Sequence, residues 1–298
     1  MIKIKNLNII IDTDPGTDDA LALGVAAAYF KNNIRALIST YGNVDGEQTY
    51  SNLVNLAGIL NINCEIIKGN LTPFGKDKDS LVYTDYHGKN GLCGLELPTA
   101  PVGNGAPAVP LPSVYDMIKK HKPIKYIAIG PLTNISELLE KFPDSVNYID
   151  ELIIMGGGFD VSNMENDAEF NFSMDPVAVR KVLASPVKKV IAPLDMTHLL
   201  AFSLSDIEDI TGANRDILAK IFYLNYETSV KHGNQGAIIH DATTLAYLFD
   251  KSKCDLQSYK IISDEYGAVR KHSDGYSVTV IEKIDREYIK NLLRGVFA

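Results

Sequence analysis

Tryptophan is absent from the 298 residues, and cysteine is scarce, with three residues in all. Without tryptophan, any aromatic surface that binds a ligand must be built from tyrosine, phenylalanine or histidine. The cysteines, Cys64, Cys93 and Cys254, share no metal-binding spacing, and an odd number gives no disulfide framework. We therefore expect them to be core or incidental residues.

The chain also lacks a long apolar run and an excess of basic residues. No segment approaches the roughly 18 unbroken apolar residues of a membrane-spanning helix. Residues 1–6 lead directly into an expected short strand and not into a secretory apolar region. The formal charge of −8, without a basic run, disfavours a nucleic-acid partner and a strongly anionic substrate. We expect a cytoplasmic protein with neither membrane nor nucleic-acid partners.

With 46% hydrophobic and 22% charged residues, the composition is that of an ordinary soluble globular protein. The length permits one large domain or two smaller ones. No internal repeat, low-complexity tract or convincing linker divides the chain. We therefore expect a single domain over residues 1–298.

Apolar strand-like runs alternate with segments of helical periodicity. This alternation predicts an α/β fold with a single open, mostly parallel sheet flanked by helices around a Rossmann-like core. Residues 259–281 alternate as a small antiparallel C-terminal addition, followed by a terminal helix. The expected strands are 7–11, 34–41, 64–68, 124–129, 151–155 and 187–192, and the expected helices are 18–30, 48–60, 113–121, 135–142, one from 175, 214–230 and one after 241.

The most informative stretch, residues 12–20, lies at a predicted strand-to-helix junction and reads DTDPGTDDA, with four carboxylates in eight residues. A helix N-terminus favours acidic residues, which would account for Asp18 and Asp19 but not for Asp12 and Asp14. Nearby like charges raise each other's pKa unless a cation or donors offset them. A hard divalent cation held by oxygen ligands is the economical explanation, and a capped turn is the alternative.

Polar clusters follow several of the predicted strands. They lie at residues 12–19, at Asn43, at 133–134 and at 195–198. In open α/β sheets, ligands bind beyond the carboxyl ends of the strands, so these loops should converge on one pocket. The long segment 70–105, with Tyr83, Tyr86 and His87, has the length of a functional loop.

Together these pieces resemble the inosine-uridine preferring nucleoside hydrolase family, over nearly the whole chain. The ordered set of motifs is far more specific than any one of them. The matching pieces are the acidic run 12–20, Tyr41-Gly42-Asn43, His87-Gly88, Gly130-Pro-Leu-Thr133-Asn134, Met155-Gly-Gly-Gly, Ala168-Glu169-Phe170-Asn171, Pro193-Leu-Asp195-Met-Thr-His198 and His240-Asp241-Ala242.

The resemblance implies the nucleoside hydrolase fold and calcium-dependent hydrolysis of the N-glycosidic bond of ribonucleosides, giving a free base and ribose. By resemblance, Asp14, Asp19 and Asp241 would bind Ca²⁺ through their side chains, and Thr133 would offer its backbone carbonyl. Asp14 would also take a proton from the attacking water. Asp12 would order the loop. The resemblance further suggests a homodimer or homotetramer.

The resemblance also implies a set of substrate contacts. Hydrogen bonds to the ribose would orient the substrate, while the carboxylates would stabilise positive charge at C1′ and the ring oxygen. For Asn163 and Asn171 taken alone, a turn residue is the more ordinary interpretation. The matching ribose positions are Asp18, Asn43, Asn163, Glu169 and Asn171, and Met155 belongs to the same predicted site.

A departing nucleobase needs a proton, and His240 matches a family histidine that supplies it directly or through a relay. Phe170, Tyr223, Tyr226 and His87 are the candidate base contacts, although His87 could also be a surface loop residue. The absence of tryptophan and the presence of His240 favour a pyrimidine-preferring or broad substrate range. Lys89-Asn90, after His-Gly, departs from the residues that many relatives have there.

Two other functions remain open from the sequence. The Asp12-Thr-Asp14 run after a strand is similar to the nucleophile motif of haloacid-dehalogenase-like phosphatases, but this leaves Asp18, Asp19 and Asp241 unexplained. The second is a catalytically silent, calcium-dependent nucleoside-binding protein. The presence of both proton-transfer candidates, Asp14 and His240, disfavours it.

Overall fold

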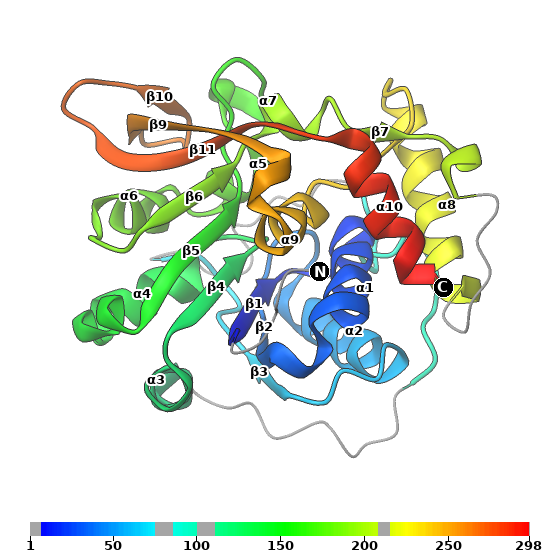
Figure 1. Cartoon of the computed structure of the whole chain (residues 1–298), viewed down its shortest axis with the longest axis horizontal. Helices are drawn as coiled ribbons and strands as arrows, with labels where there is room; N and C mark the ends of the chain where they lie inside the picture. Colours follow the sequence, from blue (N-terminus) through cyan, green and yellow to red (C-terminus); the bar gives the residue numbers. More distant parts are fainter. Residues whose placement is uncertain (1–6, 75–85, 100–110, 208–214, 298) are drawn as a thin grey trace.

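The computed structural model describes residues 7–74, 86–99, 111–207 and 215–297. A nine-stranded sheet runs through them in the order β10-β9-β11-β6-β5-β4-β1-β2-β3 (Figure 1). Pairing is parallel from β11 to β3, whereas β9 is antiparallel to both β11 and β10. The strands are β1 (Ile9–Thr13), β2 (Ile34–Ser39), β3 (Glu65–Lys68), β4 (Ile124–Ala128), β5 (Ile149–Met155), β6 (Lys189–Ala192), β9 (Cys254–Ser263), β10 (Val269–Lys271) and β11 (Tyr276–Ile284), and β7 (Ala201–Phe202) pairs separately with β8 (Ala237–Ile238).

Helices cover both faces of the sheet (Figure 1). One apolar core lies under α1, α2, α8, α9 and α10, and a second lies under α3, α4 and α6. None of the helices in the described ranges is long and apolar enough to cross a membrane. The helices are α1 (Thr17–Phe30), α2 (Gly46–Ile59), α3 (Leu111–His121), α4 (Thr133–Lys141), α5 (Phe170–Met174), α6 (Pro176–Ala184), α7 (Leu194–Thr197), α8 (Arg215–Lys231), α9 (Ala242–Phe249) and α10 (Arg286–Phe297).

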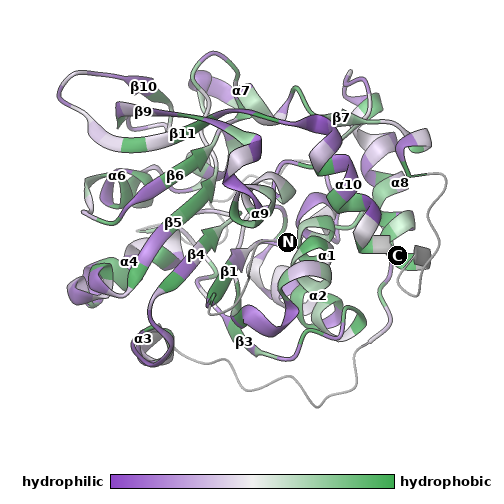
Figure 2. Cartoon of the chain, viewed as in Figure 1, coloured by the Kyte–Doolittle hydropathy of each residue, from purple (hydrophilic) through white to green (hydrophobic). Residues whose placement is uncertain are grey.

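Strand β1 shows why the central strands are apolar at every position. Ile9 and Ile11 point into the core beneath α1, whereas Ile10 points into the opposite core, and all three are fully buried. A parallel sheet covered on both faces requires such uninterrupted apolar runs. Figure 2 shows hydrophobic colouring along much of the central strands β4, β5 and β6.

The fold also sets where a ligand can bind. The chain leaves β1 toward β2 and β3 on one side, and toward β4, β5 and β6 on the other. A crevice opens beyond the carboxyl ends of the strands at such a reversal of strand order. The acidic run follows β1 and the Gly130-Pro-Leu-Thr133 loop follows β4, so both lie at this crevice.

The opposite, amino edge of the sheet carries a buried carboxylate. Glu151 at the start of β5 is inaccessible to solvent and lies 2.8 Å from Nζ of Lys188, 2.8 Å from Nζ of Lys251 and 3.1 Å from Nζ of Lys125. The Tyr247 hydroxyl also donates to it, at 3.1 Å. Burial raises the pKa of Glu151, but the lysines outweigh burial and lower it to about 2.

The predicted α/β class and mostly parallel sheet are confirmed, and strand and helix bounds agree to within a few residues. The C-terminal strands are more closely integrated than the sequence suggests, because β11 pairs in parallel with β6 and continues the main sheet. The short helices α5 and α7 were not predicted. The single-domain organisation stays a prediction. Residues 75–85, including Tyr83, and residues 100–105 of the long segment 70–105 lie outside the described residues.

Candidate active site

A cavity of about 350 Å³ lies at the crevice beyond the ends of β1 and β4, where the strand order reverses. Loops that follow β1, β2, β5 and β6 all reach it, so the predicted convergence of the strand-end loops is confirmed in outline. Its walls are acidic and amide groups together with imidazole and aromatic rings. The lining residues are Asp18, Asp19, Asn43, Tyr86, His87, Ile129, Met155, Asn163, Met164, Glu169, Phe170, Asn171, Leu194, His198, His232, Asn234, His240 and Asp241.

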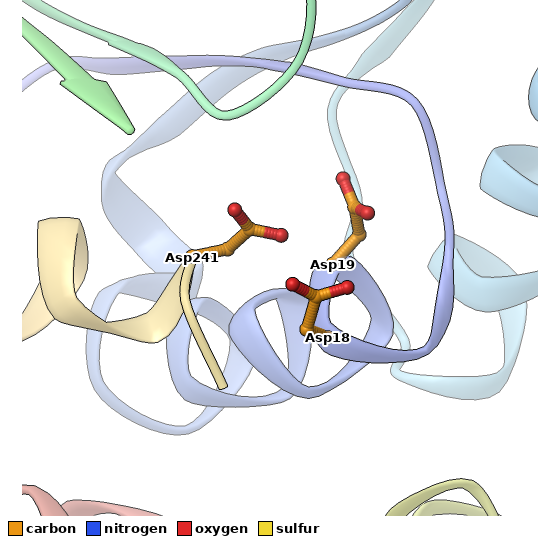
Figure 3. Close-up of side chains that lie close together, drawn as sticks. All are labelled: Asp18, Asp19 and Asp241. Atoms are coloured by element: carbon orange, nitrogen blue, oxygen red, sulfur yellow. The ribbon is translucent and has the colours of Figure 1, made fainter. Parts of the chain in front are cut away.

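Three carboxylates of the cavity come together although Asp241 is remote in sequence. One oxygen each from Asp18, Asp19 and Asp241 lies within 4.8 Å of the others, and all three residues are buried. Figure 3 shows them turned toward one another, two from the first turn of α1 and Asp241 from the residue before α9. Burial, reinforced by the neighbouring carboxylates, raises the pKa of Asp241 well above its usual range.

Asp14 lies beside this trio and carries an unpaired oxygen. Its Oδ2 accepts the backbone N–H of Asn43 at 2.8 Å, whereas its buried Oδ1 has no hydrogen-bond partner among the described residues. Gly42 and Gly130 make room for this carboxylate, because a Cβ would lie 2.0 Å from Oδ2 at Gly42 and 2.5 Å from Oδ1 at Gly130. Burial and the charge of Asp19 hold the pKa of Asp14 well above its usual range.

These observations fit a metal ion. Four buried carboxylates cannot all be ionised at low cost without a cation, and a buried oxygen without a donor is costly in itself. The donor set is entirely oxygen, which suits a hard divalent cation. The three carboxylates that lie nearest to one another include Asp18, where the ligand set implied by the resemblance has Asp14.

Thr133, the remaining predicted ligand, begins α4 and is buried. Its hydroxyl donates to Asp175 at 2.7 Å and contacts the Tyr41 hydroxyl at 2.7 Å. With the side chain engaged in this way, only the backbone carbonyl of Thr133 is available for the role that the resemblance implies. The same bonds fix the start of α4 against α6 and the loop after β2.

The acidic loop is held in shape by its own side chains. Asp19 accepts the Thr13 hydroxyl and the backbone N–H of Gly16, the latter at 2.9 Å. Asn43 donates to the backbone carbonyl of Asp14 and to the carboxylate of Asp19, both at 3.0 Å. Asn43 therefore orders the loop as well as lining the cavity.

Asp12 does not line the cavity. It accepts the Tyr126 hydroxyl and the Asn134 side-chain amide, both at 2.8 Å, and so joins β1 to β4 and α4. Burial outweighs these donors and raises its pKa to about 7. This geometry matches the loop-ordering role that the sequence suggests for Asp12.

Glu169 and Asn171 line the part of the cavity at the start of α5. Glu169 caps α5 and accepts the backbone N–H groups of Gly157, Asn171 and Phe172, while burial raises its pKa to about 7. The Asn171 amide donates to the carbonyls of Ile129 and Met155, at 3.3 and 3.2 Å, so it ties the ends of β4 and β5 together.

Asn163 and Phe170 complete the predicted contacts on this side. Asn163 is exposed and accepts the backbone N–H of Phe170 at 2.9 Å, which is the turn-forming role expected of an isolated asparagine. Both residues still line the cavity. A ribose contact from Asn163 stays a prediction.

Histidine side chains form part of the remaining wall. Nδ1 of His240 lies 2.7 Å from the Thr197 hydroxyl, and its ring centroid lies 5.3 Å from that of His198. Burial, helped by His198 and His87, lowers the pKa of His240 to about 3. His87 is buried, and burial lowers its pKa to about 4. Both imidazoles are therefore neutral near pH 7 and can donate through one N–H each.

Two predicted base contacts, Tyr223 and Tyr226, do not line the cavity. Tyr223 is 46% exposed and donates to Glu227, and Tyr226 packs at the margin of the core. The inward face of α8 is instead occupied by Phe222, Asn225 and Ser229, all fully buried. Tyr226 shares a helical face with Phe222 and Ser229 but packs against the core and not the cavity, whereas Tyr223 points outward, so these two assignments are corrected.

Other lining residues were not predicted as contacts. The ring of Tyr86 lies 4.9 Å from that of His232 and 5.0 Å from that of His87. Asn234 follows His232 in the turn after α8. His198 belongs to a strand-end cluster that the sequence pattern already placed at the pocket. Tyr86, His232 and Asn234 lie in irregular segments, where no periodicity indicates the direction of a side chain.

Residues 9–291 match the family model described as inosine-uridine preferring nucleoside hydrolase. The chain is 32% identical over 249 residues to the pyrimidine-specific ribonucleoside hydrolase RihA of Escherichia coli (strain SMS-3-5 / SECEC), covering 81% of this chain and 79% of that protein. RihA of Enterobacter sp. (strain 638) is 31% identical over 248 residues with the same coverage.

Solved structures show the same fold. A plant nucleoside hydrolase, the PpNRh1 enzyme, superposes with a TM-score of 0.87 at 22% identity, covering 98% of this chain and 99% of that one. A purine-preferring ribonucleoside hydrolase from Gardnerella vaginalis gives 0.87 at 23% identity, covering 97% and 98%. At this level of identity the likeness concerns the fold.

Proposed function

The chain belongs to the inosine-uridine preferring nucleoside hydrolase family, and from that premise we propose how it cleaves its substrate: with a calcium ion at the acidic loop, Asp14 as the base and His240 at the leaving group. Hydrolysis of ribonucleosides at the N-glycosidic bond is the activity of the family and of this enzyme. The ion, the residue roles and the base range are the proposed parts.

The observation that carries the metal proposal is the unpaired, buried Oδ1 of Asp14 beside three further buried carboxylates. Asp14, Asp19, Asp241 and the backbone carbonyl of Thr133 are the proposed ligands, and six to eight oxygen ligands suit Ca²⁺. When bound, such an ion lowers the pKa of a water molecule that it holds and orients that water for attack.

Asp14 is the proposed base. The Asn43 backbone N–H holds its Oδ2, and its buried Oδ1, which has no partner among the described residues, is the oxygen proposed to accept the proton. As the bond to the nucleobase breaks, positive charge spreads over C1′ and the ring oxygen, and the surrounding carboxylates stabilise that charge. Asp18, Glu169 and Asn171 line the same cavity and are the proposed ribose contacts.

His240 is the proposed partner of the leaving base. Since its Nδ1 is engaged with the Thr197 hydroxyl, Nε2 is the ring nitrogen left to face a ligand. A neutral imidazole with an Nε2–H can hydrogen-bond a departing base nitrogen and stabilise the charge that develops there. His198, with its ring beside that of His240, is placed to take part in a proton relay.

A pyrimidine-preferring or broad base range is proposed on two grounds. The rings of the described cavity wall belong to Phe170, Tyr86 and four histidines, and the chain has no tryptophan for a larger stacking surface. The RihA relatives are described as pyrimidine-specific. Assembly as a homodimer or homotetramer likewise stays a prediction, and light scattering of the purified chain checks it.

A reverse-phase assay of uridine, cytidine, inosine and adenosine, with and without a calcium chelator, tests the proposal. We expect free base from the pyrimidine nucleosides at the highest rate, loss of activity with chelator and recovery with added calcium. Full activity in chelator would refute the metal assignment, and faster release of hypoxanthine or adenine would refute the base range.

The two alternatives have distinct outcomes. Family membership already speaks against a haloacid-dehalogenase-like phosphatase, and release of phosphate from sugar phosphates without release of base from nucleosides would reverse that conclusion. Calorimetric binding of a nucleoside with no base or ribose produced over hours would indicate a silent binding protein.

A further inference from the structure

A chain of three buried side chains runs from α8 to the wall of the cavity. Nδ2 of Asn225 lies 3.0 Å from the Thr17 hydroxyl, and that hydroxyl lies 3.0 Å from Nδ1 of His87. All three residues are buried. At its far end, Nε2 of His87 lies 3.6 Å from Oδ1 of Asp18, and both residues line the cavity.

The positions of the protons on these three hydrogen-bonded side chains follow from one backbone group. The backbone N–H of Thr17 points at Nδ1 of His87, with a nitrogen-to-nitrogen distance of 3.2 Å. A backbone N–H can only donate, so Nδ1 must be the unprotonated nitrogen of a neutral imidazole. The proton of the ring therefore sits on Nε2, on the side of the cavity.

The hydroxyl and the amide are then fixed in turn. Because Nδ1 carries no proton, the Thr17 hydroxyl must donate to it, and its oxygen is free to accept. Asn225 must then present its NH₂ group to Thr17. Its carbonyl Oδ1 is consequently turned away, and it is buried without a partner among the described residues. A buried acceptor without a partner is costly, and the donation from Nδ2 to Thr17 accounts for this orientation of the amide.

Turning the ring over would cost both contacts that Thr17 makes with Nδ1. Gly16 packs against it so closely that a Cβ there would lie 2.9 Å from Nδ1 of His87. A flipped ring would present a carbon to the Thr17 donors. At 3.6 Å from Asp18, the Nε2–H is too far for a good hydrogen bond within the protein. It is therefore a directed donor still available to a ligand.

We propose that Thr17 and Asn225 are positioning residues, which hold His87 as the Nε2–H tautomer so that it donates a hydrogen bond to an oxygen of the bound substrate. The identity of that ligand rests on the proposed function, whereas the tautomer and its partners do not. Thr17 and Asn225 act only through His87 and are not themselves catalytic.

Nitrogen-15 spectra of the full chain labelled at its six histidines test the tautomer directly. His87→Gln identifies the His87 signals. We expect an unprotonated Nδ1 whose resonance is displaced by accepted hydrogen bonds, and a protonated Nε2. Thr17→Val should move the Nδ1 resonance toward that of a free imidazole nitrogen, and Thr17→Ser should restore it. A protonated Nδ1 in the wild type, or an Nδ1 resonance unchanged by Thr17→Val, would overturn the proposal.

Kinetics and metal binding supply the second measurement. Loss of one well-placed hydrogen bond should lower kcat/KM for uridine about tenfold in Thr17→Val, with recovery in Thr17→Ser. Asn225→Leu should show part of the same loss. Thr49→Val, which removes a buried hydroxyl from α2 outside the cavity, is the matched control and should leave the Nδ1 resonance and kcat/KM unchanged.

Calorimetric titration with calcium alone separates His87 from the neighbouring acidic loop. Equal calcium affinity in wild type and Thr17→Val supports action through His87, and a parallel loss of calcium affinity and kcat/KM contradicts it. If the wild type cleaves no nucleoside, the proposed function fails. The tautomer measurements decide the positioning of His87 in either case.

Discussion

Replacing Glu151 by glutamine should destabilise the protein in a strongly pH-dependent way while leaving catalysis intact. Three lysine ammonium groups surround the Glu151 carboxylate, which is inaccessible to solvent. Glutamine has nearly the same shape and keeps a hydrogen-bond acceptor but carries no charge. The experiment therefore isolates the charge of one buried group.

The magnitude follows from the pKa. The lysines lower the pKa of Glu151 from the ordinary 4.5 to about 2 in the folded chain. Since a tenfold change in an equilibrium constant corresponds to about 1.4 kcal/mol, ionised Glu151 contributes on the order of 3 kcal/mol to the free energy of unfolding. For a chain of this length, that loss lowers Tm by roughly 5 °C.

Because the pKa of Glu151 is lower in the folded chain, the stabilisation depends on pH in a defined range. A carboxyl whose pKa is lower in the folded than in the unfolded chain stabilises the protein fully above about pH 5. The contribution falls as pH drops from 4.5 and is lost near pH 2. The difference in unfolding free energy between wild type and Glu151→Gln should therefore be largest at pH 6 to 8 and shrink steadily toward pH 3.

Urea denaturation and thermal melts at pH 3.5, 5 and 7 measure this difference. Asp150→Asn is the matched control, because Asp150 is adjacent and more than half exposed, and among the described residues it forms an ion pair only with Lys125. Its effect should stay below about 1 kcal/mol. A Glu151→Gln variant as stable as the wild type at pH 7, or one whose deficit is the same at pH 3.5, would refute the reasoning. The Glu151 carboxylate lies at the amino edge of the sheet, away from the cavity. A lower kcat/KM in folded Glu151→Gln would contradict the expectation that its charge does not affect catalysis.

The remaining predictions concern the site. His240→Ala should reduce kcat for uridine by about 10² or more but affect p-nitrophenyl riboside little, because the nitrophenolate leaving group needs no proton; equal losses on both substrates would exclude the leaving-group role. Asp14→Asn should suppress both substrates, and near-normal turnover with calcium bound would show that Asp14 is not the base. Removing calcium with a chelator should lower Tm, because a cation that binds only the folded chain stabilises it by mass action; a Tm indifferent to chelator and to added calcium would argue against the metal site.

Most of the fold could be predicted because its determinants are local. Residues 34–39 are buried at nearly every position and mostly apolar, and this apolar run can be seen in the sequence and predicts a strand. The acidic run, residues 12–20, could likewise be placed at a strand-to-helix junction. The parallel pairing of β11 with β6 could not be predicted, because it joins segments almost ninety residues apart through backbone groups that every sequence shares.

In the candidate site too, some residues could be predicted from the sequence and others could not. Residues in strand-end loops, such as Asp18, Asn43 and Asn171, reach the cavity as predicted. Tyr223 and Tyr226 do not, because an aromatic side chain on a helix is equally compatible with a surface position. Only packing decides which side of α8 faces inward, and that packing depends on α1 and β8.

Two rings of the cavity wall, those of Tyr86 and His232, are carried by parts of the fold other than those that hold the carboxylates. Asp241 is anchored by α9, whose residues Ala242 and Leu245 are buried in the core with those of α1. His232, by contrast, is exposed at the end of α8, next to the turn that carries Asn234. Substitutions in that turn disturb neither the acidic loop nor the central strands. A library randomised at residues 86, 232 and 234 should therefore yield enzymes with altered base ranges that all retain the same hydrolytic apparatus.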